Sequence, residues 1–231
     1  MHSILAEAGP KEQARCLLVL LPGAGNRDSS FFDRGFVDAV KSRLLSVDVL
    51  AADASIGYYV KGIVWDRLAN DVIKPAQARG YEHTWLAGIS LGGLGAIIYP
   101  REQPGTVDGV FVMAPFLGEE DVINEITTAG GLRKWQAPPR IDPITKDNYQ
   151  REVWRWLRSV TSGQENGPVL YLGFGSRDRF APSEQLLAAE LEPDHVYENR
   201  GAHDWPTWAE EWLKFLDNSE FASMCASAAK G

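Results

Sequence analysis

The strongest constraint on the fold is an alternation between short apolar runs and segments with helical spacing. The apolar runs span residues 16–21 (CLLVLL), 47–53, 84–89, 107–116 and 168–176. None of them alternates between apolar and polar positions, so each would be buried on both faces. Such strands, separated by helices, are typical of a parallel sheet covered on both sides. We therefore predict an α/β fold with a doubly wound, mostly parallel sheet.

The helical segments follow the apolar runs in turn. A proline restricts two of them: Pro75 should kink or shorten the end of one, and another should stop near Pro100. A weak short strand is expected at 195–199. The segments with helical spacing are 31–45, 62–80, 91–100, 182–192 and 205–218.

The length and composition favour a single domain over residues 1–231. With 45% hydrophobic residues, the chain can bury one sizeable core. Residues 118–167 are less regular and are expected to hold two helices, at 120–128 and 148–161. This segment is too small for a core of its own, so we interpret it as a cap-like insertion. Residues 218–231 are rich in small side chains and are expected to form a loose tail.

The charge and the cysteines exclude several classes of partner. The net charge is −8 without a basic cluster, which argues against nucleic acid and anionic membranes. No apolar run is long enough to span a bilayer, and the N-terminus lacks the pattern of a signal peptide. Cys16 and Cys225 have no metal-type spacing and do not suggest a disulfide framework. We expect a soluble, cytoplasmic protein with reduced thiols, and no metal or organic cofactor; its oligomeric state is not indicated.

Ser90 lies in the turn GISLG, between the predicted strand 84–89 and the following helix. The bare pattern G-x-S-x-G is weak, but its place between a strand and a helix is that of a nucleophile elbow. In such a turn the serine takes a strained conformation, and side chains at Gly88 and Gly92 would clash. An ordinary strand-to-helix turn is the alternative. We favour Ser90 as a candidate nucleophile.

A serine hydroxyl needs a base, and the chain has four histidines. His2 is near a terminus. His83 precedes the strand that leads to Ser90, and His195 begins a strand, which places both at the opposite edge of the sheet from Ser90. His203 follows the last strand and precedes the last helix, so it should lie at the edge of Ser90. His203 is therefore the candidate base, with Asp204 as the N-cap of the helix.

An acid should orient the base, and a second donor should stabilise the oxyanion. Asp178 follows the strand 168–176 at the correct edge, so we favour it as the acid. The oxyanion donors are expected to be the backbone N–H groups of Leu91 and Ala24, the latter in the loop PGAG. A simple Pro-Gly turn is the alternative for that loop. The alternative acids follow the strand 107–116: Glu119, Glu120 and Asp121.

Ser90, Asp178 and His203, in this chain order, resemble the α/β-hydrolase superfamily. The elbow GISLGG is typical of that superfamily, and GAHDWPTW is similar to the histidine loop of several small esterases. The resemblance covers nearly the whole chain, from Cys16 to Leu216. It implies a hydrolase fold, a serine nucleophile and acyl-enzyme chemistry. The loop PGAG departs from the His-Gly start common in that superfamily, which leaves the oxyanion donor in this loop open.

The substrate pocket is expected at the same edge of the sheet. Aromatic and apolar residues there predict a pocket for a small or medium, largely apolar ester. A thioesterase or an acyltransferase would use the same triad, and a non-catalytic ligand-binding member of the fold is a third alternative. The partner is then a small-molecule ester or thioester. The predicted pocket residues are Tyr58, Tyr59, Phe116, Leu117 and Trp135.

Overall fold

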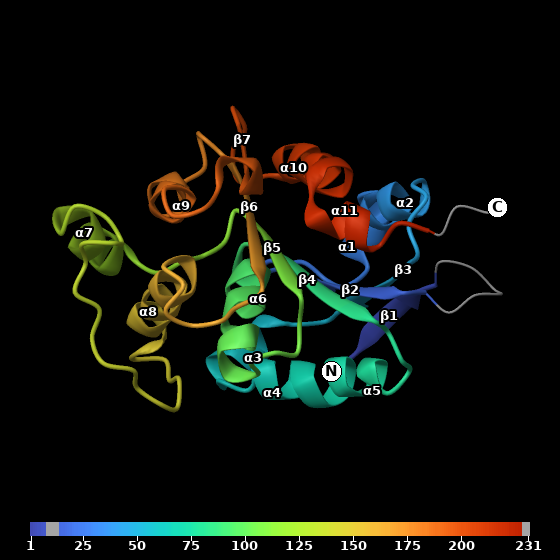
Figure 1. The fold of residues 1–231 in the computed structure, drawn as a ribbon, viewed down its shortest axis with the longest axis horizontal. Helices are drawn as coiled ribbons and strands as arrows, with labels where there is room; N and C mark the ends of the chain where they lie inside the picture. Colours follow the sequence, from blue (N-terminus) through green and yellow to red (C-terminus); the bar gives the residue numbers. More distant parts are fainter. Residues whose placement is uncertain (8–13, 228–231) are drawn as a thin grey trace.

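The computed structural model describes residues 1–7 and 14–227. In this part of the chain a seven-stranded sheet has the order β1-β3-β2-β4-β5-β6-β7 (Figure 1). Neighbouring strands are parallel except for β1 and β3, which are antiparallel. The predicted mostly parallel sheet is confirmed, whereas the edge strand β1 was not predicted. The strands are β1 (Ser3–Ala6), β2 (Cys16–Leu21), β3 (Val47–Ala52), β4 (His83–Ile89), β5 (Gly109–Met113), β6 (Val169–Gly175) and β7 (Val196–Asn199).

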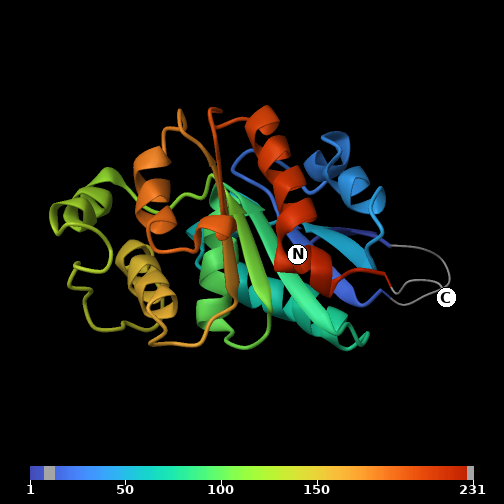
Figure 2. The same cartoon turned by 45° about the horizontal axis from the view of Figure 1, so that its top comes forward.

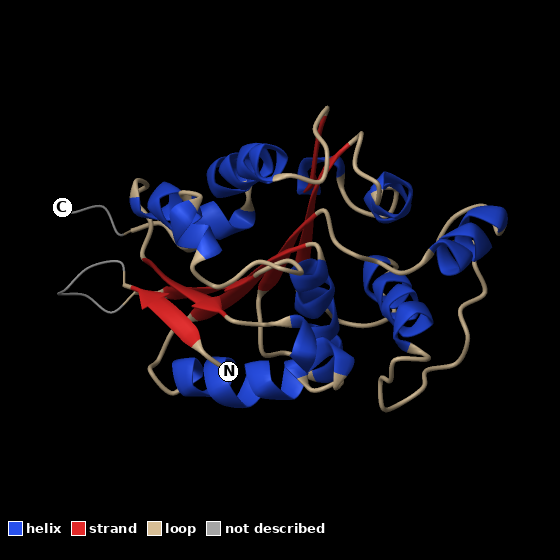
Figure 3. Ribbon diagram, turned by 180° about the vertical axis from the view of Figure 1, so that it is seen from behind, coloured by secondary structure: helices blue, strands red, loops and turns tan. Residues whose placement is uncertain are grey.

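The sheet separates two apolar cores, because successive side chains of a strand point to opposite faces. In β2, Leu17 and Val19 belong to one core and Leu18 and Leu20 to the other. All four are fully buried, which explains why β2 lacks polar positions. Figure 3 shows the sheet between its two layers of helices.

Helices cover both faces of the sheet (Figures 1 and 2). One face carries α1 (Ser30–Asp33), α2 (Phe36–Lys41), α10 (Trp205–Asn218) and α11 (Glu220–Met224). The core of the other face includes residues of α4 (Val64–Leu68), η1 (Ala69–Ile73), α5 (Lys74–Gln77), α6 (Leu91–Glu102), α7 (Glu120–Thr128), α8 (Tyr149–Thr161) and α9 (Ala181–Ala188). Two short helices complete the described chain: α3 (Ile56–Val60) and η2 (Pro193–His195).

Three predicted helices differ in detail. The segment 31–45 is broken into two helices at Gly35, whose φ of 76° is left-handed. In the segment 62–80 a π-helical turn precedes Pro75, and the helix ends at Gln77. The helix after Ser90 continues past Pro100 to Glu102. Pro100 lies in the last turn, where a missing N–H removes only one backbone hydrogen bond.

The two cysteines correct the expectation of reduced thiols. Cys16 and Cys225 form a disulfide, with their Cα atoms 5.8 Å apart. The chain brings them together because α11 returns the C-terminal segment to the start of β2, where the backbone N–H of Ser46 donates to the carbonyl of Cys225. Because the two cysteines are 209 positions apart, spacing alone gave no signal of this pairing.

The segment expected to be a loose tail also differs from that expectation over its described part. Residues 220–224 form α11, and Cys225 is held by the disulfide. The backbone N–H of Ser227 then donates to the carbonyl of Leu44. Residues 228–231 lie outside the described residues.

The irregular segment 118–167 holds α7 and α8, close to the ranges expected for its two helices. Both lie at one end of the molecule, near α9 (Figures 1 and 2). The indole of Trp154 is fully buried in α8, and its Nε1 donates to the carbonyl of Leu117 at 2.7 Å. This bond ties α8 to the chain just after β5. Within the described residues, no helix has the length and apolar character needed to cross a membrane.

Candidate active site

Ser90 occupies a sharp turn between β4 and α6. Its φ of 54° and ψ of −114° lie outside the usual regions for a residue with a side chain. Three backbone hydrogen bonds hold it there: its N–H donates to the carbonyl of Met113, and its own carbonyl accepts from Leu94 and Phe116. The strain is therefore supported from both β5 and α6.

The glycines around Ser90 are required by close backbone contacts. A Cβ on Gly88 would lie 2.2 Å from the carbonyl oxygen of Gly92. A Cβ on Gly92 would lie 2.1 Å from the carbonyl oxygen of Leu21, at the end of β2. Real Cβ atoms do not approach this closely, so only glycine fits at both positions. The turn therefore packs directly against the end of β2.

Ser90, His203 and Asp178 lie in a hydrogen-bonded row. Ser90 Oγ is 3.1 Å from His203 Nε2, and His203 Nδ1 is 2.7 Å from Asp178 Oδ2. If Nδ1–H donates to the carboxylate, Nε2 is free to accept from the hydroxyl. The Asp178 side chain is fully buried, whereas the His203 side chain is partly exposed. This is the arrangement of a nucleophile, a base and an orienting acid.

Aromatic rings and a short network hold the His203 loop in place. The rings of Phe180 and Trp208 each meet the imidazole edge to face, with centroids 5.1 Å away. Asp204 caps α10 as predicted, since its Oδ1 accepts from the backbone N–H of Thr207. The Thr207 hydroxyl oxygen also accepts from the N–H of Ala202. The loop is therefore fixed by α10 directly behind it.

The other acidic and histidine candidates are not in contact with this row. His83 pairs with Cys16 at the opposite end of the sheet, and His195 lies in η2 before β7, both as expected. Glu119, Glu120 and Asp121 are exposed at the start of α7. The geometry thus favours Asp178 over the alternative acids.

The two expected oxyanion donors, the N–H groups of Leu91 and Ala24, differ in how close their segments lie to Ser90. Leu91 is the first residue of α6, where backbone N–H groups lack partners within the helix. In the loop after β2, Gly23 lies against the turn, since a Cβ on it would be 3.3 Å from Ser90 Cβ. Ala24 is exposed and follows Gly23. The loop 22–25 therefore reaches Ser90, with Gly23 as the residue in contact.

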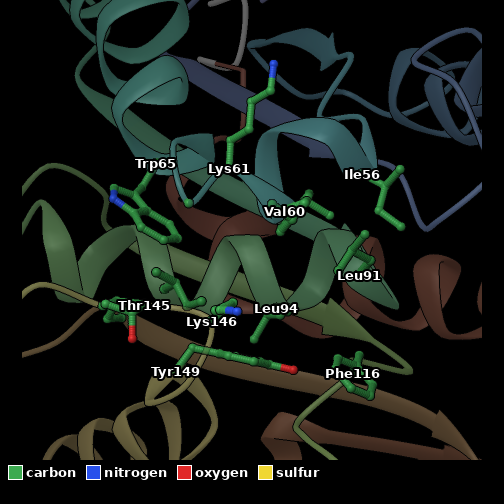
Figure 4. A pocket seen from close by; sticks show the side chains of 14 residues that line it. Ile56, Val60, Lys61, Trp65, Leu91, Leu94, Phe116, Thr145, Lys146 and Tyr149 are labelled. Carbon is green, nitrogen blue, oxygen red and sulfur yellow. The ribbon is translucent and has the colours of Figure 1, made fainter.

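An apolar cavity of about 500 Å³ lies beside the turn (Figure 4). Leu91, Leu94 and Ile98, spaced along one face of α6, form part of its wall. In Figure 4, Leu94 points from α6 toward Tyr149. The cavity therefore begins at the residue that follows Ser90. Its remaining lining comes from three other segments: Ile56, Tyr59, Val60, Lys61, Gly62, Trp65, Phe116, Ile144, Thr145, Lys146 and Tyr149.

Two of the five predicted pocket residues line this cavity: Tyr59 and Phe116. The other three line neither of the two cavities described here. Trp135 is buried, with Nε1 bonded to Glu125, and Leu117 is buried below α8. Tyr58 precedes Tyr59 in α3, so its side chain points about 100° away around the helix.

Several lining residues were missed by the sequence analysis. Leu94 and Ile98 could have been found, because they follow Leu91 at helical spacing. Trp65, Ile144 and Tyr149 gave no such signal, since they come from separate segments.

A second, more polar cavity of about 340 Å³ lies on the other side of Phe116. Phe116 lines both cavities, and its ring meets that of Phe180, which contacts His203. Charged groups from two segments, Arg179 and Glu119, line the polar cavity. The candidate triad is thus adjacent to one apolar and one polar cavity. In the described part of the chain, no group of three or more His, Cys, Asp or Glu side chains is placed to hold a metal ion.

Comparisons with solved structures agree with this architecture. S-formylglutathione hydrolase from Staphylococcus aureus is 12% identical, with a TM-score of 0.60, over 89% of this chain and 81% of the other. Monoacylglycerol lipase from Paleococcus ferrophilus is 20% identical, with a TM-score of 0.57, over 94% and 97%. Est1E from Butyrivibrio proteoclasticus, solved with ferulic acid bound, is 14% identical, with a TM-score of 0.58, over 94% of each chain. At these identities the likeness shows the α/β-hydrolase fold.

The family comparison goes further than the fold. No curated protein matches the sequence significantly. A family model named Esterase and described as "Putative esterase" matches residues 65–216, about two thirds of the chain. That range includes all three residues of the hydrogen-bonded row. The chain therefore belongs to this esterase family, as an ester hydrolase with the α/β-hydrolase fold.

Proposed function

We propose that Ser90 is the nucleophile of this hydrolase, His203 its general base and Asp178 the acid that orients the base. The observation that carries this proposal is the row of contacts from Ser90 Oγ through His203 to Asp178, at 3.1 and 2.7 Å. Its partners come from three loops at the carboxyl edge of the sheet, where α/β proteins bind ligands. The strained turn at Ser90 supports the same role.

The reaction follows from this geometry. His203 Nε2 accepts the hydroxyl proton while Ser90 Oγ attacks the ester carbonyl carbon. The backbone N–H of Leu91 and a backbone N–H of the loop 22–25 stabilise the oxyanion; Ala24 is the expected donor, and Gly23 is the residue in contact with the turn. The imidazolium then protonates the leaving alcohol, which leaves an acyl-enzyme. Water, deprotonated by His203, releases the acid and restores Ser90.

The substrate we propose is a small or medium ester with an apolar acyl group. The 500 Å³ cavity beside Leu91 would take the acyl group, because its walls are mainly aliphatic and aromatic. The polar cavity across Phe116 would take the leaving group. A thioesterase or acyltransferase with the same triad is the second candidate; one structural relative is named for a thioester substrate, S-formylglutathione. The assembled row argues against a non-catalytic ligand-binding protein.

The remaining features of the proposal concern domains and location. We propose one domain over the whole chain, with 118–167 as a cap whose Ile123 and Ile144 reach the two cavities. The expected partner remains a small molecule rather than nucleic acid or membrane. A cytoplasmic location with reduced thiols was expected, because the sequence suggested neither a signal peptide, nor a bilayer-spanning run, nor a disulfide framework. Because the cysteines are joined, and disulfides persist chiefly in oxidising compartments, we propose an oxidising location instead.

The decisive experiment labels the protein with a fluorophosphonate probe and locates the adduct by mass spectrometry. We expect one adduct, on Ser90, which is absent in Ser90→Ala and strongly reduced in His203→Ala. The kcat/KM for a medium-chain ester should fall by about 10⁴-fold or more in Ser90→Ala. Ser162→Ala, an exposed serine in the segment 118–167, is the matched control and should label normally. An adduct elsewhere, or none on folded protein, would contradict the proposal.

A further inference from the structure

Two glutamates lie buried behind the candidate triad and take no part in the proposed reaction. Glu184 is in the first turn of α9, and Glu211 is in α10. Both residues are 0% exposed. α9 begins three residues after Asp178, and α10 begins two residues after His203. The two glutamates are therefore attached to the two loops that carry the acid and the base.

The backbone of β6 is open to this cluster because it has glycine at two positions. A Cβ on Gly173 would lie 2.8 Å from Glu211 Oε2. A Cβ on Gly175 would lie 2.4 Å from the carbonyl carbon of Gly201, in the His203 loop. Glu211 and the His203 loop thus lie side by side against β6, the strand that ends three residues before Asp178.

The carboxyl oxygens of this pair lack the partners that a buried charge requires. Neither oxygen of Glu184 has a hydrogen-bond partner among the described residues, and neither does Oε2 of Glu211. The single contact is from Asn199 Nδ2 to Glu211 Oε1, at 3.4 Å. An ionised carboxylate in such surroundings is costly unless it is paired.

A third buried glutamate shows how this chain accommodates a charge. Glu152, in α8, is as buried as Glu184. Its Oε2 accepts from Arg101 at 2.5 Å and from Arg155 at 3.1 Å. No arginine or lysine within the described residues forms such a pair with Glu184 or Glu211. The contrast indicates that Glu184 and Glu211 are held as neutral acids.

The charges that face the pair favour the same state. Burial, then the charges of Asp178 and Glu211, raise the pKa of Glu184 to about 10. Burial and Asp178 raise the pKa of Glu211 to about 9, with smaller contributions from Glu210 and Asp204 in the same direction and from Lys214 in the opposite one.

We infer that Glu184 and Glu211 are an uncharged acid pair that positions Asp178 and the His203 loop, and that ionisation of the pair ends activity at alkaline pH. Two consequences follow from the geometry. An added charge here would have no partner and would be repelled by Asp178, so α9 or α10 must shift to hydrate it. That shift would separate His203 from Asp178. The inference rests on the proposed roles of His203 and Asp178.

The test compares pH profiles of kcat/KM for a medium-chain ester, measured by pH-stat in the wild type and in the neutral isosteres Glu184→Gln, Glu211→Gln and their double variant. With a group of pKa about 9, the wild type should lose about tenfold of its activity between pH 8 and pH 10. The double variant should lose less than about twofold, each profile being scaled to its own value at pH 7.5. Glu210→Gln makes the same substitution at the exposed neighbour paired with Lys214, and it should move the alkaline limb only slightly, because Glu210 contributes less to the pKa of Glu211 than burial and Asp178 do. An unchanged alkaline limb in the double variant would overturn the inference.

A second measurement does not depend on catalysis. Infrared spectroscopy of the wild type at pH 7.5 should show the C=O stretch of a protonated carboxylic acid, which disappears in the double variant and persists in Glu210→Gln. If that band is absent from the wild type, the pair is ionised and the inference fails. If the band is present but Ser90 is not labelled by the fluorophosphonate, the proposed function fails and the neutral pair stands.

Discussion

The turn at Ser90 and the cavity beside it differ in how the chain builds them. The shape of the turn depends on two glycines of one short segment, because Gly88 packs against the carbonyl of Gly92 and Gly92 packs against that of Leu21, at the end of β2. The cavity is assembled from α3, one face of α6 and residues 144–149, which meet only in the folded protein. Its rim even exposes a large apolar residue, Val60, at 76%. The proposed nucleophile thus lies in a turn held by close backbone contacts, and the proposed acyl cavity is built from distant segments.

The largest expected effect tests the rigidity of the turn. Gly92→Ala would place a Cβ 2.1 Å from the carbonyl oxygen of Leu21, so β2 and α6 must separate. We expect a loss of about 4 kcal/mol or more in the free energy of unfolding, enough to abolish soluble folded protein. Urea unfolding and soluble yield measure this.

The matched control for that change lies on the cavity side. A Cβ on Gly57, in α3, meets no atom within 4 Å. Gly57→Ala should therefore be neutral or stabilising by up to about 1 kcal/mol. If Gly92→Ala is as stable as Gly57→Ala, the turn is not rigid and the contrast between the two regions is wrong.

The next prediction tests whether the turn depends on the disulfide at the other end of β2. Cys16→Ser with Cys225→Ser should lower the free energy of unfolding by about 2–4 kcal/mol, because it removes a covalent restraint on the unfolded chain. We expect kcat/KM at 25 °C to remain within about twofold of the wild type, since glycine contacts rather than the disulfide shape the turn. A large loss of activity in a folded variant would make the disulfide part of the site.

The same contrast explains what the sequence could predict. The hydrogen-bonded row could be predicted because each of its members lies in a segment that follows a strand, and parallel strands bring such segments to one edge of the sheet. Ser90, Asp178 and His203 needed no knowledge of side-chain packing. The close contact at Gly92 could also be predicted, because only glycine permits it.

The parts that were not predicted depend on contacts between distant segments. Trp65 and Tyr149 meet in the cavity wall, although nothing in either segment indicates the other. The disulfide joins residues 209 positions apart, and it forms only because α11 turns the chain back to β2. The buried Glu184 has the sequence context of an ordinary helix residue, and only its surroundings in the fold show that it is unpaired. Local sequence patterns predict backbone geometry, whereas the cavity wall, the disulfide and the unpaired glutamate depend on tertiary packing.

A pH-dependent effect concerns stability behind the candidate triad and follows from the raised pKa of Glu184. In the unfolded chain this carboxyl loses its proton above about pH 4.5, whereas in the folded protein it keeps the proton up to about pH 10. Its contribution to stability is therefore full below pH 4.5 and declines as the pH rises toward 10. The slope should be about 1.4 kcal/mol per pH unit.

Urea unfolding at several pH values between 5 and 8 measures this slope. Glu184→Gln should remove it, so that the variant gains stability over the wild type as the pH rises. Glu210→Gln, on the exposed side of α10, should follow the wild type. Parallel curves for the wild type and Glu184→Gln would show that Glu184 ionises in the folded protein.

The smallest expected effect tests whether the apolar cavity selects the substrate. Leu94→Trp would fill part of the space between α6 and Tyr149 without touching the turn (Figure 4). The ratio of kcat/KM for a long-chain ester to that for an acetate ester should fall about tenfold, or about 1.4 kcal/mol, because the longer acyl group loses apolar contact. Leu213→Trp, the same change at an exposed position of α10, should leave the ratio unchanged. If both variants keep the wild-type ratio, the acyl group binds elsewhere, and the polar cavity across Phe116 becomes the site to test, because Phe116 lines both.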